Sequence, residues 1–377
     1  MPVLRSIRKR FAGERPLDGL RVGACLHVTA ETANLVRALA AGGAEVALCA
    51  ANPLSTQDDV AEVLGAETVV RAAHGTDPAP GQREVAEWAP TITLDDGADL
   101  LALLHEAAAL PDGFLGATEE TTTGLVRARA LDLRCPVLAL NEARTERVFN
   151  DHYGTGQSTL DGILRATNIL LAGRTVVVLG YGFTGRGIAG RARGAGALVI
   201  VCEVDPLRAL EARMEGYAVM PALDAAERGD VFITVTGVPG VLGAEHFARM
   251  KDGATLANAG HFDVEIDIAA LGHEHRDVLP LVEQFVVGDR RLNLLARGRV
   301  VNLAAGQGHP AEIMDISFAL HALAVEWLAR EGPALGPGVH PVPDELDREV
   351  ARLKLAALDV AIDSLTPEQE AYRNSWA

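Results

Sequence analysis

The stretch TVVVLGYGFTGRG, residues 175–187, joins a short run of apolar, mostly β-branched residues to a glycine-rich turn. The turn has the spacing GxGxxG and consists of Gly180, Tyr181, Gly182, Phe183, Thr184 and Gly185. A helical pattern follows, and a second apolar strand ends at Glu203. A strand, a glycine turn, a helix and an acid about twenty residues further on make up the dinucleotide-binding fingerprint. The sequence therefore predicts a Rossmann domain around this stretch.

The chemistry of this turn predicts NAD as the cofactor. Its glycines let backbone N–H groups approach a pyrophosphate at the N-terminus of the following helix. Glu203 is expected to accept hydrogen bonds from the adenosine ribose and to disfavour the 2′-phosphate of NADP, an effect that Arg208 partly offsets. The alternative is a glycine-rich turn that binds no dinucleotide, but the complete fingerprint favours the cofactor.

Two further strand patterns, residues 230–237 and 254–260, continue the same sheet. The polar or small residues at their carboxyl ends are Thr236, Asn258, Gly260 and His261. Open sheets bind the nicotinamide at this edge, so we expect these residues near the cofactor and the substrate. Asn258 and His261 have a second interpretation, as turn formers.

Towards the N-terminus, short apolar runs alternate with helical patterns. Residues 21–28 and 44–50 predict buried parallel strands, and residues 29–43 and 55–66 predict helices. Further strand ends follow at residues 91–97, 114–120 and 136–140. Polar residues gather just after the strands, where open sheets place ligands. They are His27, Thr29, Glu31, residues 52–58, Asp95, Asp96, residues 119–123 and those from Asn141 onward.

The length of 377 residues and the repeated pattern predict two domains. The predicted fold class is α/β, with two doubly wound parallel sheets and the Rossmann domain inserted into a discontinuous substrate domain. We place the substrate domain at residues 1–150 and 310–345 and the NAD-binding domain at residues 151–309. Residues 310–332 predict a long amphipathic helix, and residues 346–377 predict a C-terminal helix and tail that contact a partner subunit.

Composition excludes several classes of partner. The net charge of −17 argues against nucleic acid and anionic membranes. No apolar run approaches the ~20 residues of a membrane span, and the basic N-terminus lacks the apolar segment of a secretory signal. The four cysteines have no CxxC spacing, which predicts reduced core residues of a cytoplasmic protein. His273 and His275 lack a third ligand, so we expect a surface turn and no metal.

Residues 141–154, NEARTERVFNDHYG, hold six titratable side chains shortly before the glycine turn. One interpretation is a solvated linker between the domains. The other is a reaction centre that faces the cofactor. The residues of this stretch alone do not separate the two.

Several motifs together resemble the S-adenosyl-L-homocysteine hydrolase (adenosylhomocysteinase) family. They are, in chain order, HVTAETANLV, NPLSTQDD, LDDGADL, EETTTG, GYGFTGRG, MEGY, GHFDVEID, GRVVNLA and GHPAEIM. The resemblance implies a mechanism in which NAD⁺ oxidises the nucleoside 3′-hydroxyl. The ketone acidifies the C4′ proton, the 5′ substituent leaves, water adds, and the hydride returns to the sugar. A homotetramer is usual in the family, so the resemblance implies a homo-oligomer, a dimer or a tetramer.

The resemblance also implies roles for individual residues. Thr29 and Glu31 match adenine-side positions, and His309 and Met314 close the base pocket. Groups near the 5′ carbon are matched by His27, Asp96 and His261, and Glu120 matches the acid that holds the ribose hydroxyls. The cofactor positions matched are Thr121, Thr122, Thr123 and Asn302.

Departures from the family pattern concentrate on the sugar face. The family lysine that contacts the reacting hydroxyl is Glu146 here, an aspartate–asparagine pair is reversed as Asn150-Asp151, and a cysteine is Thr155. The family's C-terminal lysine and tyrosine have no counterpart before Asn374-Ser375-Trp376-Ala377. A carboxyl group among carboxylates is expected to have a raised pKa, which would let Glu146 act as a general acid or base. The alternative is a surface acid in a non-catalytic relative.

Three functions follow from this pattern. The first is a redox-neutral lyase that removes water from the 5′ position of an adenine nucleoside, like the relative of this family that converts psicofuranine to angustmycin A. Hydroxide is a poor leaving group, so a proton donor is required, and His27, Asp96 and His261 are the candidates. The second is hydrolysis of S-adenosyl-L-homocysteine. The third is a regulator that only binds NAD or a nucleoside. Epimerisation through the same ketone differs from the first only after oxidation.

Overall fold

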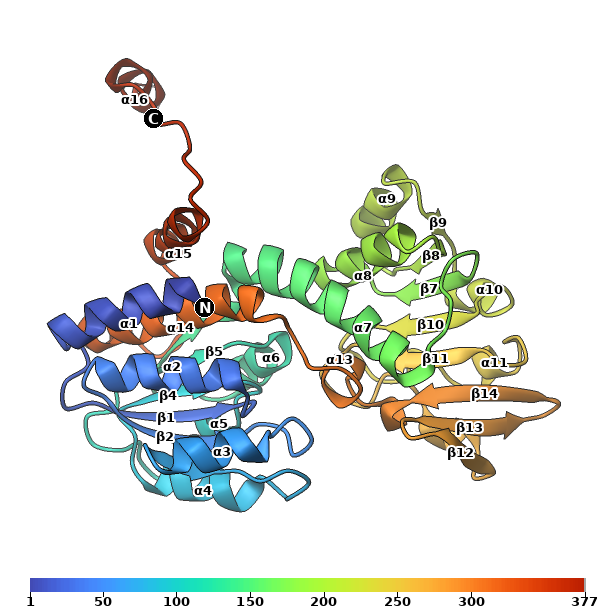
Figure 1. Cartoon of the computed structure of the whole chain (residues 1–377), viewed down its shortest axis with the longest axis horizontal. Coiled ribbons are helices and arrows are strands. Elements are labelled where there is room, and N and C mark those ends of the chain that lie inside the picture. The colour runs from blue at the N-terminus through green and yellow to red at the C-terminus, as the bar shows by residue number, and fades with distance from the viewer. Residues whose placement is uncertain (376–377) are drawn as a thin grey trace.

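The computed structural model describes residues 1–375 and contains two α/β units (Figure 1). One unit holds the N-terminal strands together with the long helix α14 (Ala311–Glu331), and the other holds the glycine turn. The predicted α/β class with two doubly wound sheets is therefore confirmed. Trp376 and Ala377, at the end of the predicted C-terminal segment, lie outside the described residues.

All seven strands of the first sheet run parallel, in the spatial order β3-β2-β1-β4-β5-β6-β15. They are β1 (Arg21–Leu26), β2 (Glu45–Ala50), β3 (Val69–Arg71), β4 (Ile92–Asp95), β5 (Gly116–Glu119), β6 (Pro136–Ala139) and β15 (Gly338–Pro341). Strands β1 and β4 are neighbours although β2 and β3 come between them in the chain, so the direction of winding reverses there. Sheets of this kind bind ligands outside the carboxyl ends of such strands.

The second sheet has the order β9-β8-β7-β10-β11-β14-β13-β12, whose first six strands follow the dinucleotide-binding order. They are β7 (Thr175–Leu179), β8 (Leu198–Cys202), β9 (Ala218–Val219), β10 (Val231–Thr234), β11 (Thr255–Asn258) and β14 (Arg290–Leu295). The last two, β12 (His275–Leu279) and β13 (Val282–Val287), add an antiparallel edge. The direction of winding reverses between the neighbouring strands β7 and β10, and the glycine turn follows the carboxyl end of β7 at this point.

Helices cover both faces of the first sheet. One face packs on α1 (Pro2–Glu14), α2 (Ala30–Ala41) and α14, and the other on α4 (Ala79–Glu87) and α5 (Asp99–Glu106). The remaining helices of this unit are α3 (Asp58–Gly65) and α6 (Thr122–Ala130). The sequence analysis did not predict α1. This helix is polar overall but buries Val3, Leu4, Ile7 and Phe11.

The second sheet is also covered on both faces. The helices of one face are α7 (Gly156–Thr167), α8 (Phe183–Gly194), α9 (Pro206–Met214) and α13 (Val301–Ala304). Those of the other face are α10 (Ala222–Ala226), α11 (Ala244–Phe247) and α12 (Ile268–Leu271). Apolar strands such as VVV at residues 176–178 are fully buried, as expected for a parallel sheet covered on both sides.

The two units meet along α7 and the π-helix η2 (Glu146–Thr155) that precedes it. A Cβ on Gly187 of α8 would lie 2.0 Å from the carbonyl oxygen of His152, so η2 and α8 are in direct backbone contact. At the C-terminus, α15 (Asp344–Ala357) packs on α14 and α1, and α16 (Pro367–Asn374) stands away from both units (Figure 1). Asp347 of α15 accepts hydrogen bonds from the backbone of Arg144 and Thr145.

The four cysteines are free and buried, as predicted. Within residues 1–375, no helix is long and apolar enough to cross a membrane. Residues 273–275 are exposed at the start of β12, and the described part of the chain has no cluster of three or more His, Cys, Asp or Glu residues placed to hold a metal ion.

Candidate functional site

A histidine–aspartate pair occupies the carboxyl end of the first sheet. His27 follows β1 and Asp96 follows β4, which are the two strands where the winding reverses. His27 Nε2 lies 3.1 Å from Asp96 Oδ2, and His27 Nδ1 lies 2.5 Å from Ser55 Oγ. Burial opposes the charge on both groups, but the mutual attraction outweighs it. It raises the pKa of His27 above 6.5 and lowers the pKa of Asp96 to about 2.

The second unit contributes His261 to the same place. Its Nδ1 lies 3.9 Å from Asp96 Oδ1, and a Cβ on Gly97 would lie 3.6 Å from its Nε2. The carboxylate of Asp96 therefore lies between two imidazoles, one from each unit. Such an arrangement provides a proton donor and a proton acceptor held by one negative charge.

The loop that carries His261 is fixed by buried polar groups. Asn258 has no exposed surface; its amide donates to the carbonyls of Gly260, Phe262 and Gly298, and its oxygen accepts from Gly260 N and Thr234 Oγ1. Every polar atom of the Asn258 side chain is thus used within the protein. Of the two interpretations of Asn258, its geometry favours the turn former that positions His261.

Glu120 follows β5 and meets a second carboxyl group, that of Glu146 at the start of η2. Asn150, one turn after Glu146, donates to Glu146 Oε2 at 2.8 Å and lies 3.5 Å from Glu120 Oε1. Helix α14 completes the cluster. Ser317 Oγ donates to Glu146 Oε2 at 2.8 Å, and His321 Nε2 lies 3.2 Å from Glu120 Oε2.

Burial and the neighbouring charge of Glu120 raise the pKa of Glu146 well above its usual range. Burial likewise raises the pKa of Asp151 to about 7. Glu146 is only 1% exposed, so its interpretation as a surface acid is wrong, and so is the interpretation of this stretch as a solvated linker. The predicted rise in pKa is confirmed, with burial as the main cause.

Two of the four residues matched to base-side positions line a cavity of about 640 Å³ between the units. Glu31 of α2 and His309 both line it, together with Gln157 and Asp161 of α7. Thr29 is the N-cap of α2. His309 Nε2 lies 2.9 Å from Thr155 Oγ1, and burial lowers the pKa of His309 to about 4, so its ring is neutral near pH 7. Met314 packs against the core under the first sheet and does not line the cavity.

The glycine turn has the shape that a pyrophosphate requires. Gly180 has φ +106°, and a Cβ there would lie 2.9 Å from the carbonyl oxygen of Val235. A Cβ on Gly185 would lie 2.1 Å from Gly180 O, so helix and strand approach closely. Gly182 is the N-cap of α8. A Cβ placed on it would have Arg208 Nη1, at 3.8 Å, as its nearest neighbour, so the space beside it is open. Phe183 and Thr184 form the first turn of α8, beside this open space.

Glu203 lies at the end of β8, where the ribose of a dinucleotide is bound in such folds. Its Oε2 accepts from Tyr181 N at 2.7 Å, and its Oε1 accepts from the backbone of Val204 and Asp205. A carboxylate has about four acceptor positions, so one remains for a ribose hydroxyl. Thr236, after β10, is held by Glu265, whose carboxylate accepts from the backbone and side chain of Thr236.

Asn302 of α13 offers an unsatisfied acceptor. Its Nδ2 donates to Ser158 Oγ at 3.2 Å, and its buried Oδ1 has no hydrogen-bond partner. A nicotinamide carboxamide has the N–H that such an oxygen needs. The open Gly182, the remaining acceptor of Glu203 and this oxygen together fit NAD.

The threonines after β5 mainly stabilise their own loop. Thr121 Oγ1 donates to Glu119 Oε1 at 2.7 Å and accepts from Gly124 N, which caps α6. Thr122 Oγ1 donates to Asn141 Oδ1. Thr123 Oγ1 lies 3.4 Å from Thr121 Oγ1. Their predicted contact with the cofactor stays a prediction.

Sequence reasoning missed three buried residues of the site: Ser317, His321 and Glu265. Ser317 and His321 lie in a long apolar helix, where single polar residues have the pattern of ordinary core positions. Their spacing of one turn, i and i+4, was the available signal, because it places both on one face.

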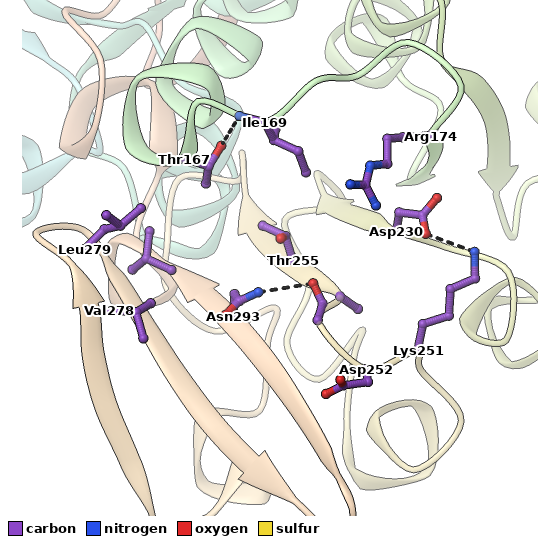
Figure 2. A pocket seen from close by; sticks show the side chains of 13 residues that line it. Thr167, Ile169, Arg174, Asp230, Lys251, Asp252, Thr255, Val278, Leu279 and Asn293 are labelled. Carbon is purple, nitrogen blue, oxygen red and sulfur yellow. Dashed lines mark hydrogen bonds and ion pairs between the residues drawn. The ribbon is translucent and has the colours of Figure 1, made fainter.

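A separate hollow of about 280 Å³ lies at the opposite edge of the second sheet (Figure 2). Arg174 and Asp230 precede β7 and β10, so this hollow is at the amino ends of the strands. Asp230 pairs with Lys251 at 2.9 Å across it. Open sheets bind ligands at the carboxyl ends, and none of the predicted site residues lines this hollow.

Two doubly wound units that join a dinucleotide turn to clustered acids and histidines define an NAD-dependent enzyme of two α/β domains. The family model described as "S-adenosyl-L-homocysteine hydrolase, NAD binding domain" matches residues 151–308, and the model "S-adenosyl-L-homocysteine hydrolase" matches residues 1–113. Relatives resemble the whole chain. Adenosylhomocysteinase of Gloeobacter violaceus is 53% identical and that of Aquifex aeolicus is 54% identical.

These alignments cover 100% of this chain and 91% and 93% of the two relatives. S-inosyl-L-homocysteine hydrolase of Methanopyrus kandleri is 54% identical, over 100% of this chain and 92% of its own. The chain belongs to the S-adenosyl-L-homocysteine hydrolase family, and NAD is its cofactor.

Replacement of Glu203 by glutamine is expected to lower the preference for NAD over NADP about tenfold, because one repulsive charge of ~1.4 kcal/mol toward a 2′-phosphate is removed. The measurement is the ratio of dissociation constants of the two cofactors. Glu227→Gln, which changes an exposed acid paired with Arg249, is the matched control. An unchanged ratio would show that Glu203 does not select the cofactor.

Proposed function

We propose that this protein is a redox-neutral lyase that removes water from the 5′ position of an adenine nucleoside, with a psicofuranine-like sugar as substrate. The observation that supports the proposal is the carboxyl pair Glu120–Glu146, in which Glu146 is buried and Glu120 is partly buried. A lysine at position 146 would bring a cation to the sugar face. This chain instead places there a buried carboxyl group, whose pKa burial raises well above its usual range.

Gly182, Glu203 and Asn302 would hold NAD⁺, which when bound would supply the redox chemistry as a reversible hydride acceptor for the carbon of a secondary sugar hydroxyl. Glu120 is the group that accepts the hydroxyl proton, because its carboxylate is only partly buried and faces the sugar position. Burial and the charge of Glu120 favour the protonated form of Glu146, which limits the negative charge beside the forming ketone. Asn150 donates a hydrogen bond to Glu146 and lies close to Glu120, and so fixes the positions of the two carboxyl groups relative to each other.

The second half of the reaction uses the groups around Asp96. His261 accepts the proton of the carbon next to the ketone, C4′ in a ribonucleoside. The C–H electron pair forms the new double bond, and the C5′–O bond breaks. His27 in its cationic form donates a proton to the leaving oxygen, which departs as water. Asp96 stabilises positive charge on the rings, and its short contact to His27 raises the pKa of that ring. Return of the hydride and of the hydroxyl proton leaves the substrate minus one water.

Hydrolysis of S-adenosyl-L-homocysteine is the second candidate function. Relatives named adenosylhomocysteinase are 53–54% identical over the whole chain, which favours it. The two functions share oxidation and proton removal and differ in the leaving group and in the addition of water. The carboxyl group in place of the lysine is the feature that favours the lyase.

One experiment separates the two. The purified enzyme is incubated with psicofuranine, adenosine and S-adenosyl-L-homocysteine in D₂O, and product masses and free thiol are recorded. The lyase is expected to yield a product lighter by one water from psicofuranine, and solvent deuterium at the C4′-type carbon of recovered substrate. Thiol release without any dehydrated nucleoside would assign the hydrolase instead.

Substitutions of Glu146 give a second test. Glu146→Lys is expected to lower dehydration about 10- to 100-fold, because a cation would replace the carboxyl group that accepts hydrogen bonds from Asn150 and Ser317. Glu146→Gln keeps the shape and the neutral charge and is expected to retain more of the activity. Relative rates of dehydration and thiol release are measured for both variants. A gain in thiol release by Glu146→Lys together with unchanged dehydration would contradict the proposed role.

The domain limits and assembly also remain proposals. We propose that residues 1–150 and 310–345 bind the nucleoside, and that the C-terminal segment, including α16, contacts a second copy of the chain in a dimer or tetramer. The exposed residues Leu358, Ile362 and Leu365 support this contact, because they form an apolar stretch between α15 and α16. Size-exclusion chromatography with light scattering, with and without residues 358–377, tests it.

A further inference from the structure

Helix α14 faces both carboxyl groups of the sugar site with side chains one turn apart. Ser317 is 1% exposed and His321 has no exposed surface. Ser317 Oγ contacts Glu146 and Asn150, and His321 Nε2 contacts Glu120. The two helices thus cross so that the i and i+4 positions of α14 each meet one member of the carboxyl pair. Nothing in the catalytic sequence proposed above uses His321.

His321 is unusual for a core residue. Its Nδ1 is buried and has no hydrogen-bond partner, so one polar atom of the ring remains unsatisfied. Leaving such an atom unpaired is costly, and a side chain that only filled the core would avoid this cost by being apolar. Contact with Glu120 is the one hydrogen bond of the ring within residues 1–375. The contact with Glu120 is therefore the reason we infer for a histidine at position 321.

We propose that His321 is a positioning residue that fixes the Glu120 carboxylate for the sugar hydroxyl, while Ser317 fixes the neighbouring Glu146. This inference rests on the proposed function only through the oxidation step, which dehydration and hydrolysis share. The two carboxyl groups then have different roles, because Glu120 contacts His321 of α14 and Glu146 contacts Ser317 of the same helix.

The charges around Glu120 show why an added donor matters. Groups from every element packed against it act on it: Glu146 and Asp151 of η2, His27 after β1, His309 before α14 and His321 of α14. His27 and His309 lie beyond hydrogen-bond distance of Glu120 in the described structure. Two side chains contact its carboxylate directly, Asn150 on Oε1 at 3.5 Å and His321 on Oε2 at 3.2 Å, and of these only His321 comes from α14.

The test is the pH dependence of nucleoside oxidation in the intact enzyme with bound NAD. Adenosine or psicofuranine is mixed with wild type, His321→Leu and His321→Gln, and the absorbance of reduced nicotinamide is followed in a single turnover. His321→Leu is expected to slow oxidation about 10- to 100-fold, the loss of one hydrogen bond to a charged group, and to shift the acid limb of the profile to higher pH. His321→Gln keeps a donor toward Glu120 and is expected to restore most of the rate.

His340→Gln is the matched control, because His340 is a partly exposed histidine of β15 whose Nε2 lies 2.8 Å from Gly336 O. Thermal unfolding is recorded for every variant. A structural role alone would lower stability and leave the pH profile unchanged. Identical acid limbs for wild type, His321→Gln and His321→Leu would overturn the positioning role. Normal oxidation without any dehydrated product would overturn the lyase assignment and leave the role of His321 intact, so the two failures are distinguishable.

Discussion

Replacement of Asp96 by asparagine is expected to lower the rate of elimination about 100- to 10,000-fold, the range that general acid–base catalysis contributes. The amide has nearly the same shape but no negative charge. It therefore cannot stabilise a cationic ring on His27 at 3.1 Å or on His261 at 3.9 Å. Oxidation of the sugar uses Glu120, so nicotinamide absorbance is expected to persist while the dehydrated product disappears.

The pH profile of the same variant gives the sign of the effect. Asp96 raises the pKa of His27 above 6.5, so the cationic donor is present below that raised pKa and is lost as pH rises through it. Wild-type elimination is expected to fall on the alkaline side, above pH 6.5. In Asp96→Asn the cause of the raised pKa is gone and burial remains, so the residual alkaline limb is expected at lower pH.

Asp112→Asn, in an exposed loop, is the control for Asp96→Asn. Product masses and the pH dependence of elimination are compared for the two variants and wild type. An alkaline limb that stays in place in Asp96→Asn would assign the proton donor to a group other than His27.

Replacement of Glu120 by glutamine is expected to have an effect of similar size on the preceding step. Glutamine keeps the contacts to Asn150 and His321 but cannot accept the hydroxyl proton as the hydride leaves. Oxidation is expected to slow about 100- to 10,000-fold. The rate of nicotinamide reduction in a single turnover measures it, and nucleoside affinity measured separately shows whether binding has changed.

Glu142→Gln is the matched control, because Glu142 lies just before η2 and pairs with Arg129 near the surface. If Glu120→Gln oxidised nucleosides at the wild-type rate, the proton would have to go to another group. Glu146 would then be the alternative acceptor, and burial, which raises its pKa well above the usual range, favours a proton on it.

Local rules explain what the sequence determined by itself. The glycine spacing predicts the turn because a Cβ at Gly180 or Gly185 would collide with backbone atoms a few residues away or on the next strand. Buried parallel strands are continuous apolar runs, so β1, β2 and β7 could be predicted from their own residues without knowing the strands that pair with them. Ligand residues such as His27 and Asp96 follow strands, and the winding rule brings them to one edge.

Only the tertiary structure decided what surrounds the sugar. Ser317 contacts Glu146 across 171 positions of the chain, and His321 contacts Glu120 across 201. The charged stretch around Glu146 had two interpretations until its burial under α14 removed the solvated one. Asn258 had two interpretations, and its amide donates to the carbonyls of Gly260, Phe262 and the distant Gly298.

The physical reason is the range of the forces involved. Strand pattern, glycine conformation and helix period depend on neighbours within a few residues, so the amino-acid order of this chain was sufficient for the α/β class, the cofactor turn and the family. The protonation of Glu146 and the partner of Glu120 depend on desolvation and on hydrogen bonds between distant segments. Those are set only when α14 crosses η2 and the carboxyl pair is closed off from water.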